Sequence, residues 1–154
     1  MSDILIHAET PTLAFGHAED ADTPAIVGLW ERAGLTRPWN DPHADIALAR
    51  RGPHSTILLA KAGAKDGAVL AGSVMVGHDG HRGWIYYLAV EPALQGRGIG
   101  RALLIAAEDW LRARAVPKLM LLVRPDNEQV RGFYQAAGYL EEPRVVFSRR
   151  LDGK

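Results

Sequence analysis

The glycine-rich stretch Gln95-Gly96-Arg97-Gly98-Ile99-Gly100 has the composition and spacing that most directly indicate chemistry. It stands between an apolar run that ends at Val90 and a sequence with helical periodicity. Glycine lets the backbone turn tightly and leaves amide N–H groups uncovered at the start of a helix. Because these amides, the helix dipole, Arg97 and Arg101 all favour an anion, the stretch predicts a phosphate-binding loop. A purely structural strand-to-helix turn is the alternative.

Two familiar phosphate-binding loops do not fit this stretch. A Walker loop requires lysine followed by serine or threonine after its last glycine, whereas Gly100 is followed by Arg101 and Ala102. A dinucleotide-binding fingerprint has the spacing G-x-G-x-x-G, and Arg101 stands where its third glycine is required. Hydrolysis of ATP or GTP and binding of NAD are therefore disfavoured.

The composition is that of one domain without a dominant charge. The 154 residues are 47% hydrophobic, and 18 lysines and arginines balance 18 aspartates and glutamates, which disfavours nucleic-acid or membrane partners held by charge. The absence of cysteine excludes disulfides, thiolate metal sites and a cysteine nucleophile. No apolar run approaches the roughly 18 residues of a membrane helix, and no leader is evident. We therefore expect a soluble, cytoplasmic protein.

The pattern of elements predicts a single α/β domain over residues 13–151, preceded by an extended segment, residues 1–12. Helical spacing of apolar residues predicts helices at 24–33, around 46–51, 99–115 and 127–137. Apolar, β-prone runs predict strands at 55–60, 69–77, 84–90, 119–123 and through 145–147. Since the order contains hairpins as well as crossovers, we expect a mixed, mainly antiparallel central sheet flanked by helices.

Two groups of residues resemble the GNAT superfamily of acyl-CoA-dependent N-acetyltransferases. The first is Leu88-Ala89-Val90-Glu91-Pro92 with Gln95-x-x-Gly98-x-Gly100, and the second is Asn127 with Phe133-Tyr134-Gln135-x-x-Gly138-Tyr139. The two together, in this order, are far more specific than either alone. The stretches Arg37-Pro38-Trp39-Asn40-Asp41-Pro42 and Asp79-Gly80-His81-Arg82-Gly83 are further similar to the YpeA-like bacterial branch.

The resemblance implies acetyl-CoA as a co-substrate, bound without a metal where the strands before the loop and before Asn127 splay apart. It implies that the strand offers main-chain groups to the pantetheine arm and that the loop amides meet the pyrophosphate. The cofactor-binding residues implied in this way are Leu88, Ala89, Val90, Gly96, Arg97, Gly98, Ile99, Gly100, Arg101 and Asn127. An ordinary helix cap is the alternative role for Asn127.

Tyr134 matches the tyrosine that, in many members of the superfamily, protonates the departing CoA thiolate. A phenol with an ordinary pKa near roughly 10 keeps its proton at neutral pH and can donate it. A packing role on the inner face of an amphipathic helix is the alternative. The resemblance implies direct attack of an uncharged amine on the thioester, with strand N–H groups stabilising the oxyanion.

The base that deprotonates the amine is less clearly indicated. Protein N-terminal acetyltransferases of the superfamily place a glutamate on the strand before the asparagine, and Leu122 replaces it here, which disfavours a peptide N-terminus as acceptor. We take Glu91 as the candidate catalytic base. The other residues considered for this step are Asp41, Asp79, His81 and Tyr87.

Four residues are candidates for the acceptor site: Trp39, Asn40, Asp41 and His81. The ring of Trp39 could pack against a substrate stem and Asp41 could attract its ammonium group. The alternatives are that Trp39 is buried and anchors a turn, and that His81 is an exposed residue of a turn. His78 and His81 lack a third ligand at a suitable spacing, so no metal site is predicted.

These observations predict an enzyme, an N-acetyltransferase that moves an acetyl group from acetyl-CoA to a primary amine of a small molecule or a protein. No nucleic-acid or membrane partner is expected. The sequence is compatible with a homodimer as well as with a monomer. The alternative is a non-catalytic module that binds acyl-CoA as a sensor or structural ligand.

Overall fold

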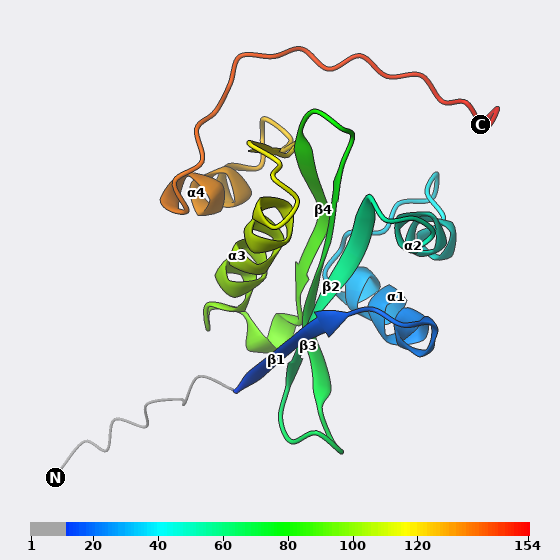
Figure 1. The fold of residues 1–154 in the computed structure, drawn as a ribbon, viewed down its shortest axis with the longest axis vertical. Helices are drawn as coiled ribbons and strands as arrows, with labels where there is room; N and C mark the ends of the chain where they lie inside the picture. The colour runs from blue at the N-terminus through cyan, green and yellow to red at the C-terminus, as the bar shows by residue number, and fades with distance from the viewer. Residues whose placement is uncertain (1–11) are drawn as a thin grey trace, which may run out of the picture.

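The computed structural model describes residues 12–154, in which a five-stranded sheet is covered by helices on both faces (Figure 1). The strands are β1 (Leu13–His17), β2 (Ser55–Ala62), β3 (Val69–His78), β4 (Gly83–Val90) and β5 (Leu119–Met120). The helices are α1 (Thr23–Arg32), α2 (Pro42–Arg50), α3 (Ile99–Arg112) and α4 (Glu128–Ala136), with short 3-10 turns η1 (Asp20–Asp22) and η2 (Pro92–Leu94). The predicted N-terminal segment, residues 1–12, lies outside the described residues except for Thr12.

The strands lie in chain order, β1-β2-β3-β4-β5. Neighbours from β1 to β4 are antiparallel, and only β4 and β5 are parallel. The predicted mixed, mainly antiparallel α/β fold is therefore confirmed. β1 was not predicted, because Leu-Ala-Phe-Gly-His lacks clear alternation and most of this edge strand is exposed.

Alternation along the strands divides the hydrophobic core into two layers. On β2, Ile57 and Leu59 face α1 and α2, whereas Leu58 and Ala60 face α3. The apolar stripe of α3 fills the second layer with the buried residues Ile99, Leu103, Leu104, Ala107 and Leu111. The sheet is thereby sandwiched between α1 with α2 and α3 with α4 (Figure 1). None of the described helices combines the length and the hydropathy needed to cross a membrane.

The C-terminal part of the prediction was wrong. The predicted strand through residues 145–147 is not formed, and the strand predicted at 119–123 is limited to Leu119–Met120. After α4 the chain runs as an extended segment away from the sheet and over the β3–β4 hairpin (Figure 1). Residues with high β propensity form a strand only where a neighbouring strand supplies hydrogen-bond partners. No described strand pairs with residues 145–147.

Trp30 of α1 is the largest fully buried side chain among the described residues. Its indole Nε1 donates a 2.9 Å hydrogen bond to the Oγ of Ser73, the one buried polar side chain that the described residues contain. The bond satisfies both groups where water has no access, so α1 is fixed to β3 by packing and by one specific polar contact.

Replacing Trp30 by alanine is expected to lower the free energy of unfolding by about 3–5 kcal/mol, because the change opens a large cavity. It also leaves Ser73 without its donor. Trp39, whose side chain is 54% exposed, offers the matched control, and Trp39→Ala should change the value by no more than about 0.5 kcal/mol. Urea denaturation of the two variants checks this. Equal losses would contradict the assignment of Trp30 as the core anchor.

Candidate active site

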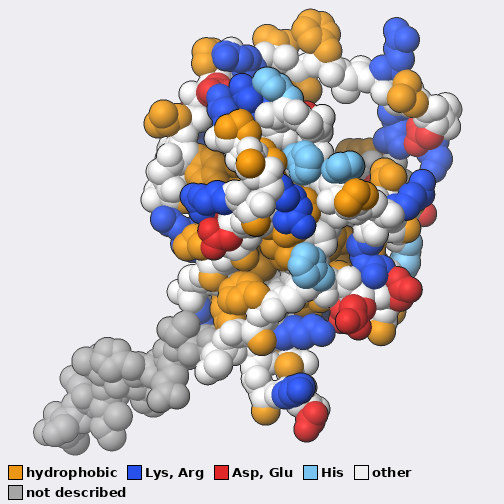
Figure 2. Space-filling view, in the orientation of Figure 1, with side chains coloured by type: hydrophobic (Ala, Val, Ile, Leu, Met, Phe, Trp, Pro, Cys, Tyr) orange, Lys and Arg blue, Asp and Glu red, His pale blue; other side chains and the backbone are white. Residues whose placement is uncertain are grey.

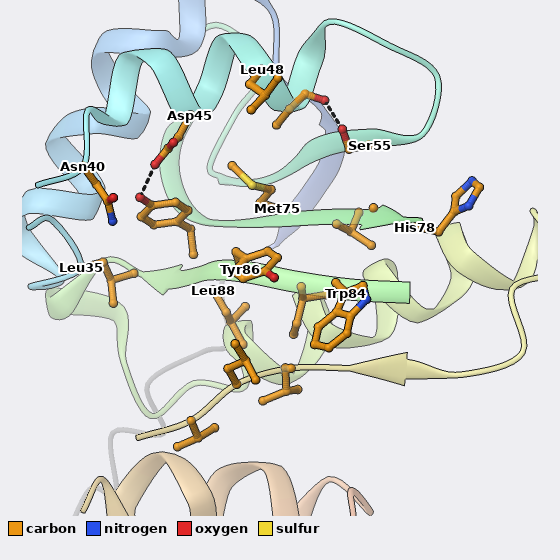
Figure 3. Close-up of a pocket in the computed structure, with 18 of the residues that line it drawn as sticks. Leu35, Asn40, Asp45, Leu48, Ser55, Met75, His78, Trp84, Tyr86 and Leu88 are labelled. Carbon is orange, nitrogen blue, oxygen red and sulfur yellow. Dashed lines mark hydrogen bonds between the residues drawn. The ribbon is translucent and has the colours of Figure 1, made fainter. Parts of the chain in front are cut away.

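A cleft opens where β4 and β5 separate. The two parallel strands pair only at Gly83–Leu119 and Trp84–Met120, and beyond these pairs no ladder joins them. The cleft has a volume of about 1090 Å³. Residues 84–88 line it on one side and residues 121–124 on the other (Figure 3). The structure thus has the splay between strands that the sequence resemblance implied.

A bulge in β4 lies on the wall of this cleft. Ser73 pairs with Ala89 and Met75 with Tyr86, so Tyr87 and Leu88 together oppose a single β3 residue. Tyr87 has a φ of 51°, in the left-handed region, which costs a non-glycine residue about 1–2 kcal/mol. A bulge of this kind turns main-chain groups out of the ladder. Leu88, within the bulge, lines the cleft, whereas Ala89 and Val90 do not line it and are paired with β3 along one edge of β4.

Two contacts hold Tyr87 in this conformation. Its ring stacks on Trp30 with centroids 3.8 Å apart and planes 4° apart. Its hydroxyl donates a 2.6 Å hydrogen bond to Oδ2 of Asp45, on α2 (Figure 3). Burial, together with this carboxylate, raises the pKa of the Tyr87 hydroxyl well above its ordinary value. Tyr87 is therefore a proton donor to Asp45 and is unsuited to act as a base at neutral pH.

The predicted phosphate loop has the backbone conformation that an anion site requires. Gly96 and Gly98 have φ values of 79° and 80°, and Gly98 is the N-cap of α3. A Cβ built on either glycine would meet nothing within 4 Å, so the loop surface is open. The first amides of α3 have no intrahelical acceptor and are available to an anion. A Cβ on Gly100, by contrast, would lie 3.6 Å from the Phe133 ring, which places the loop beside α4.

α4 brings two predicted residues to the cleft. Asn127 lines it and caps the helix, accepting a 3.2 Å hydrogen bond from the amide of Val130, so the alternative role as a cap is realised. Tyr134 also lines the cleft, and its hydroxyl forms no hydrogen bond with any described residue. Burial raises the pKa of Tyr134 to about 12. This phenol keeps its proton at neutral pH and has it free to donate.

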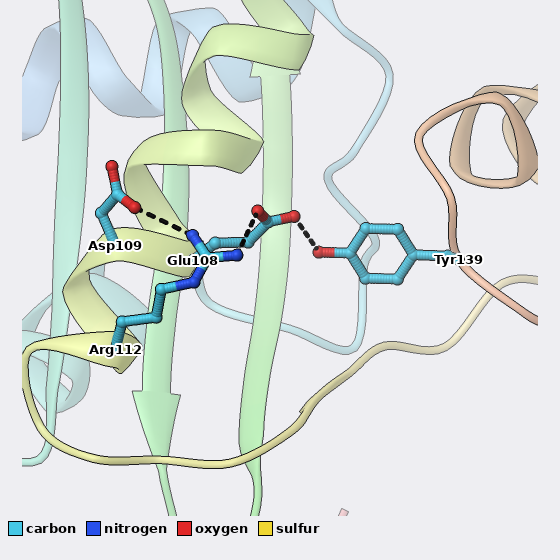
Figure 4. A network of polar contacts seen from close by, with 4 residues as sticks. All are labelled: Glu108, Asp109, Arg112 and Tyr139. Atoms are coloured by element: carbon cyan, nitrogen blue, oxygen red, sulfur yellow. Dashed lines mark hydrogen bonds and ion pairs between the residues drawn. The ribbon is translucent and has the colours of Figure 1, made fainter.

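A polar network fixes α4 against α3 and thereby places Tyr134. The hydroxyl of Tyr139 donates a 2.8 Å hydrogen bond to Glu108, and Arg112 binds both Glu108 and Asp109 (Figure 4). Tyr139 in turn contacts Tyr134 edge to face, with ring centroids 5.7 Å apart. The contacts thus run from Arg112 on α3, through Glu108 and Tyr139, to the ring of Tyr134 in the cleft wall.

The α1–α2 side of the cleft contains a carboxylate that sequence reasoning missed. Asp45 lines the cleft together with Leu35 and Asn40 (Figure 3). The helical pattern of α2 shows only that Asp45 is off the apolar face, and its partner Tyr87 is 42 residues away in the chain. Asp79 also lines the cleft, but main-chain N–H groups of Arg82 and His81 lower its pKa to about 2. Asp79 is thus a turn-forming carboxylate that is ionised at neutral pH and is a weaker base than an ordinary aspartate.

Several predicted residues lie away from the cleft lining. Trp39 is exposed on the surface, and Asp41 caps α2 by accepting hydrogen bonds from the amides of His43 and Ala44. His81 is exposed in the β3–β4 turn. Of the four acceptor-site candidates, only Asn40 lines the cleft.

Glu91, the candidate base, is engaged elsewhere. Arg32 of α1 donates three hydrogen bonds to its carboxylate, the shortest from Nη2 at 2.8 Å. Glu91 does not line the cleft. The pair joins the end of α1 to the end of β4, so the structure gives Glu91 a tethering contact instead of access to a substrate amine.

Comparison with known proteins agrees with this geometry. A solved structure of the aminoglycoside N-acetyltransferase AAC(6')-Iy in complex with CoA is 18% identical, with a TM-score of 0.77 over 94% of this chain and 98% of that one. The ribosomal-protein-S18-alanine N-acetyltransferase from Escherichia coli is 26% identical, with a TM-score of 0.72 over 93% and 88%. An acetyltransferase of Yersinia enterocolitica is 41% identical over 134 residues, 86% of this chain and 92% of the relative. The model of the Acetyltransferase (GNAT) family matches residues 20–139, and the chain belongs to this family.

Proposed function

We propose that the protein transfers the acetyl group of acetyl-CoA to a primary amine by direct attack. One observation carries this proposal. Tyr134, whose hydroxyl is free and protonated, lies on the wall of a cleft between two separating strands, next to an open helix N-terminus. This arrangement offers an anion site, a channel and a proton donor in one place.

The residues present fit the CoA moiety. The open amides from Gly96 to Arg101, with the side chains of Arg97 and Arg101, would bind the pyrophosphate at the start of α3. The backbone at Leu88, released from the ladder by the bulge, would bind the pantetheine arm. Asn127 stands on the opposite wall and can contact the cofactor while it caps α4.

Acetyl-CoA supplies a thioester, from which the acetyl group passes to nitrogen as the C–N bond forms and the C–S bond breaks. Tyr134 donates its proton to the sulfur that leaves, so no thiolate has to be released into the cleft. Backbone N–H groups at the β4 bulge would stabilise the charge that develops on the carbonyl oxygen. The ammonium form of the acceptor would give one proton to solvent before it attacks. A second proton would leave the nitrogen as the amide forms, which balances the proton that Tyr134 donates. The carboxylate of Glu91, the candidate base, is paired with Arg32.

Asp45 gives the acceptor side of the cleft a negative group. Its carboxylate accepts a hydrogen bond from Tyr87 and lines the cleft, where Asp79 is the only other carboxylate among the lining residues. A carboxylate at this position would bind the ammonium group of a substrate with more than one amine or of a lysine side chain. We therefore propose a cationic amine as the acceptor.

Calorimetric titration with acetyl-CoA, followed by thiol-release assays with polyamines, aminoglycosides, amino acids and lysine peptides, tests the function. Binding with amine-dependent thiol release is the expected result. Binding without release from any amine would favour the alternative of a non-catalytic acyl-CoA module. Absence of binding would refute the proposed function.

Gly98→Trp is expected to weaken acetyl-CoA binding at least tenfold, about 1.4 kcal/mol, because the indole would occupy the open space over the α3 amides. Gly80→Trp is the matched control. Gly80 also has a positive φ, 85°, and open space around it, but it lies in the turn at the opposite end of β4. Calorimetry on both variants separates the local effect from backbone strain, and equal affinities in the two would contradict the loop assignment.

Tyr134→Phe is expected to lower kcat by roughly a hundredfold or more while the affinity for acetyl-CoA stays close to that of the wild type. Since the hydroxyl forms no hydrogen bond with a described residue, the melting temperature should hardly change. The raised pKa, about 12, means that deprotonation of Tyr134 should cause no loss of wild-type kcat between about pH 7 and 10. A variant with unchanged kcat under single-turnover conditions would rule out the acid role.

Asp45→Asn is expected to raise KM for a cationic amine roughly tenfold, about 1.4 kcal/mol, with little effect on KM for acetyl-CoA. Asparagine keeps an oxygen that can accept the Tyr87 hydrogen bond, so the change removes mainly the charge. Tyr87→Phe is the complementary control, because it removes the hydrogen bond and leaves the charge of Asp45. Steady-state kinetics that showed the larger KM increase in Tyr87→Phe would overturn the assignment of Asp45 to the ammonium group.

A further inference from the structure

Four large side chains on one side of the cleft form an apolar surface of their own. They are Leu48 of α2, Met75 of β3, and Trp84 and Tyr86 of β4, and we call them the apolar strip. Leu48 and Tyr86 are 62% and 49% exposed. On the face of the molecule seen in Figure 2, exposed hydrophobic side chains are scattered among charged ones, whereas the apolar strip lies within a single cleft. Apolar side chains gathered in a concave site indicate a ligand with an apolar part.

The register of the strands explains why three of these side chains share one face of the sheet. Tyr86 pairs with Met75, and Trp84, two residues earlier on β4, pairs with Gly77. Paired residues point to the same side of a sheet, and so do residues two apart in a strand. Gly77 in turn pairs with Ser55 on β2. The row beside Trp84 therefore consists of small residues, which leaves its ring accessible from the cleft.

Hydrogen bonds fix both ends of the apolar strip. At one end, Nε1 of Trp84 donates a 3.2 Å hydrogen bond to Oδ2 of Asp79, the carboxylate that also accepts main-chain N–H groups of the β3–β4 turn. At the other end, Oγ of Ser55 donates a 2.7 Å hydrogen bond to the carbonyl oxygen of Ala49, the residue after Leu48 (Figure 3). The strip is thereby preformed, so an apolar group that binds there has little side-chain ordering to oppose it.

The carboxylate of Asp45 lies beside the apolar strip. Asp45 precedes Leu48 by three residues on α2, which places both side chains on the same side of the helix, and both line the cleft (Figure 3). Of the two arginines in the lining, Arg37 donates to main-chain carbonyls of its own loop, and Arg124 belongs to the facing wall. The α2 side of the cleft therefore combines a carboxylate with a preformed apolar surface.

We propose that the acceptor is an amphiphilic amine, in which a cationic group bound by Asp45 is joined to an apolar or aromatic body that lies on the apolar strip. This inference rests on the proposed function, because it takes the α2 side of the cleft as the acceptor side. A peptide in which lysine is followed by a large apolar residue has this chemistry. A hydroxyl-rich amine does not, since its hydroxyl groups would lose water against apolar side chains. Leu48 and Tyr86 are thereby specificity-determining residues.

Two probes that carry the same two amines test the inference, lysyl-phenylalanine amide and lysyl-serine amide. Their affinities are measured by calorimetry with the protein saturated with CoA, so that no acetyl transfer is needed. We expect the phenylalanine probe to bind at least tenfold more tightly, because its ring removes more apolar surface from water. Equal affinities, or tighter binding of the serine probe, would overturn the proposal.

Two variants locate the site of this preference. Tyr86→Ser and Leu48→Ser are each expected to lower the ratio of the two affinities at least threefold, since each removes part of the apolar strip. Phe15→Ser is the matched control, because Phe15 is an aromatic residue of β1 that is 48% exposed and does not line the cleft, and it should keep the wild-type ratio. A wild-type ratio in both Tyr86→Ser and Leu48→Ser would show that the apolar body binds elsewhere, which refutes the assignment of the strip.

Thiol release from acetyl-CoA with the same two probes separates this inference from the proposed function. Selective binding of the phenylalanine probe without thiol release from any amine would contradict acetyl transfer and support the apolar strip as a binding site. Thiol release with equal kcat/KM for the two probes would support acetyl transfer and overturn the amphiphilic acceptor.

Discussion

The proposed active site depends on the short ladder between β4 and β5. Parallel pairing ends after Trp84–Met120, and the separation of the two backbones creates the cleft that holds Tyr86, Leu88 and the stretch 121–124 on facing walls. Had the ladder continued, main-chain hydrogen bonds would have closed the space that a pantetheine arm needs. The glycine loop, residues 95–100, follows β4, and α4 follows the β5 stretch, so the proposed anion site and Tyr134 are both placed by the same divergence.

The strain at Tyr87 is compensated by the core. A left-handed φ on a bulky residue persists only where its surroundings fix it, and here stacking on Trp30 and the hydrogen bond to Asp45 do so. Trp30 is itself anchored to Ser73. Asp45 on the cleft, the β4 bulge and the core layer under α1 and α2 are therefore linked by direct contacts, which would preorganise the proposed acceptor side of the cleft.

Residues 121–124 and residues 84–88 differ in how well their backbones are fixed, although both stretches line the cleft. Residues 121–123 form no main-chain hydrogen bond with any residue that the structure describes, whereas residues 84–86 pair with β3. The β4 wall is therefore the firmer of the two, because paired backbone is harder to displace than unpaired backbone.

The sequence by itself determined the features that depend on local spacing: four helices, four of the five strands, the glycine loop at the start of α3, and Asn127 and Tyr134 on α4. Backbone conformation and helical periodicity are properties of a few consecutive residues, and so they can be read from the chain. Only the tertiary structure decided which side chains from distant parts of the sequence come into contact. Asp45 joins Tyr87, and Arg32 takes Glu91, over separations of 42 and 59 residues. Such pairs depend on how whole helices pack on the sheet, which no local pattern encodes.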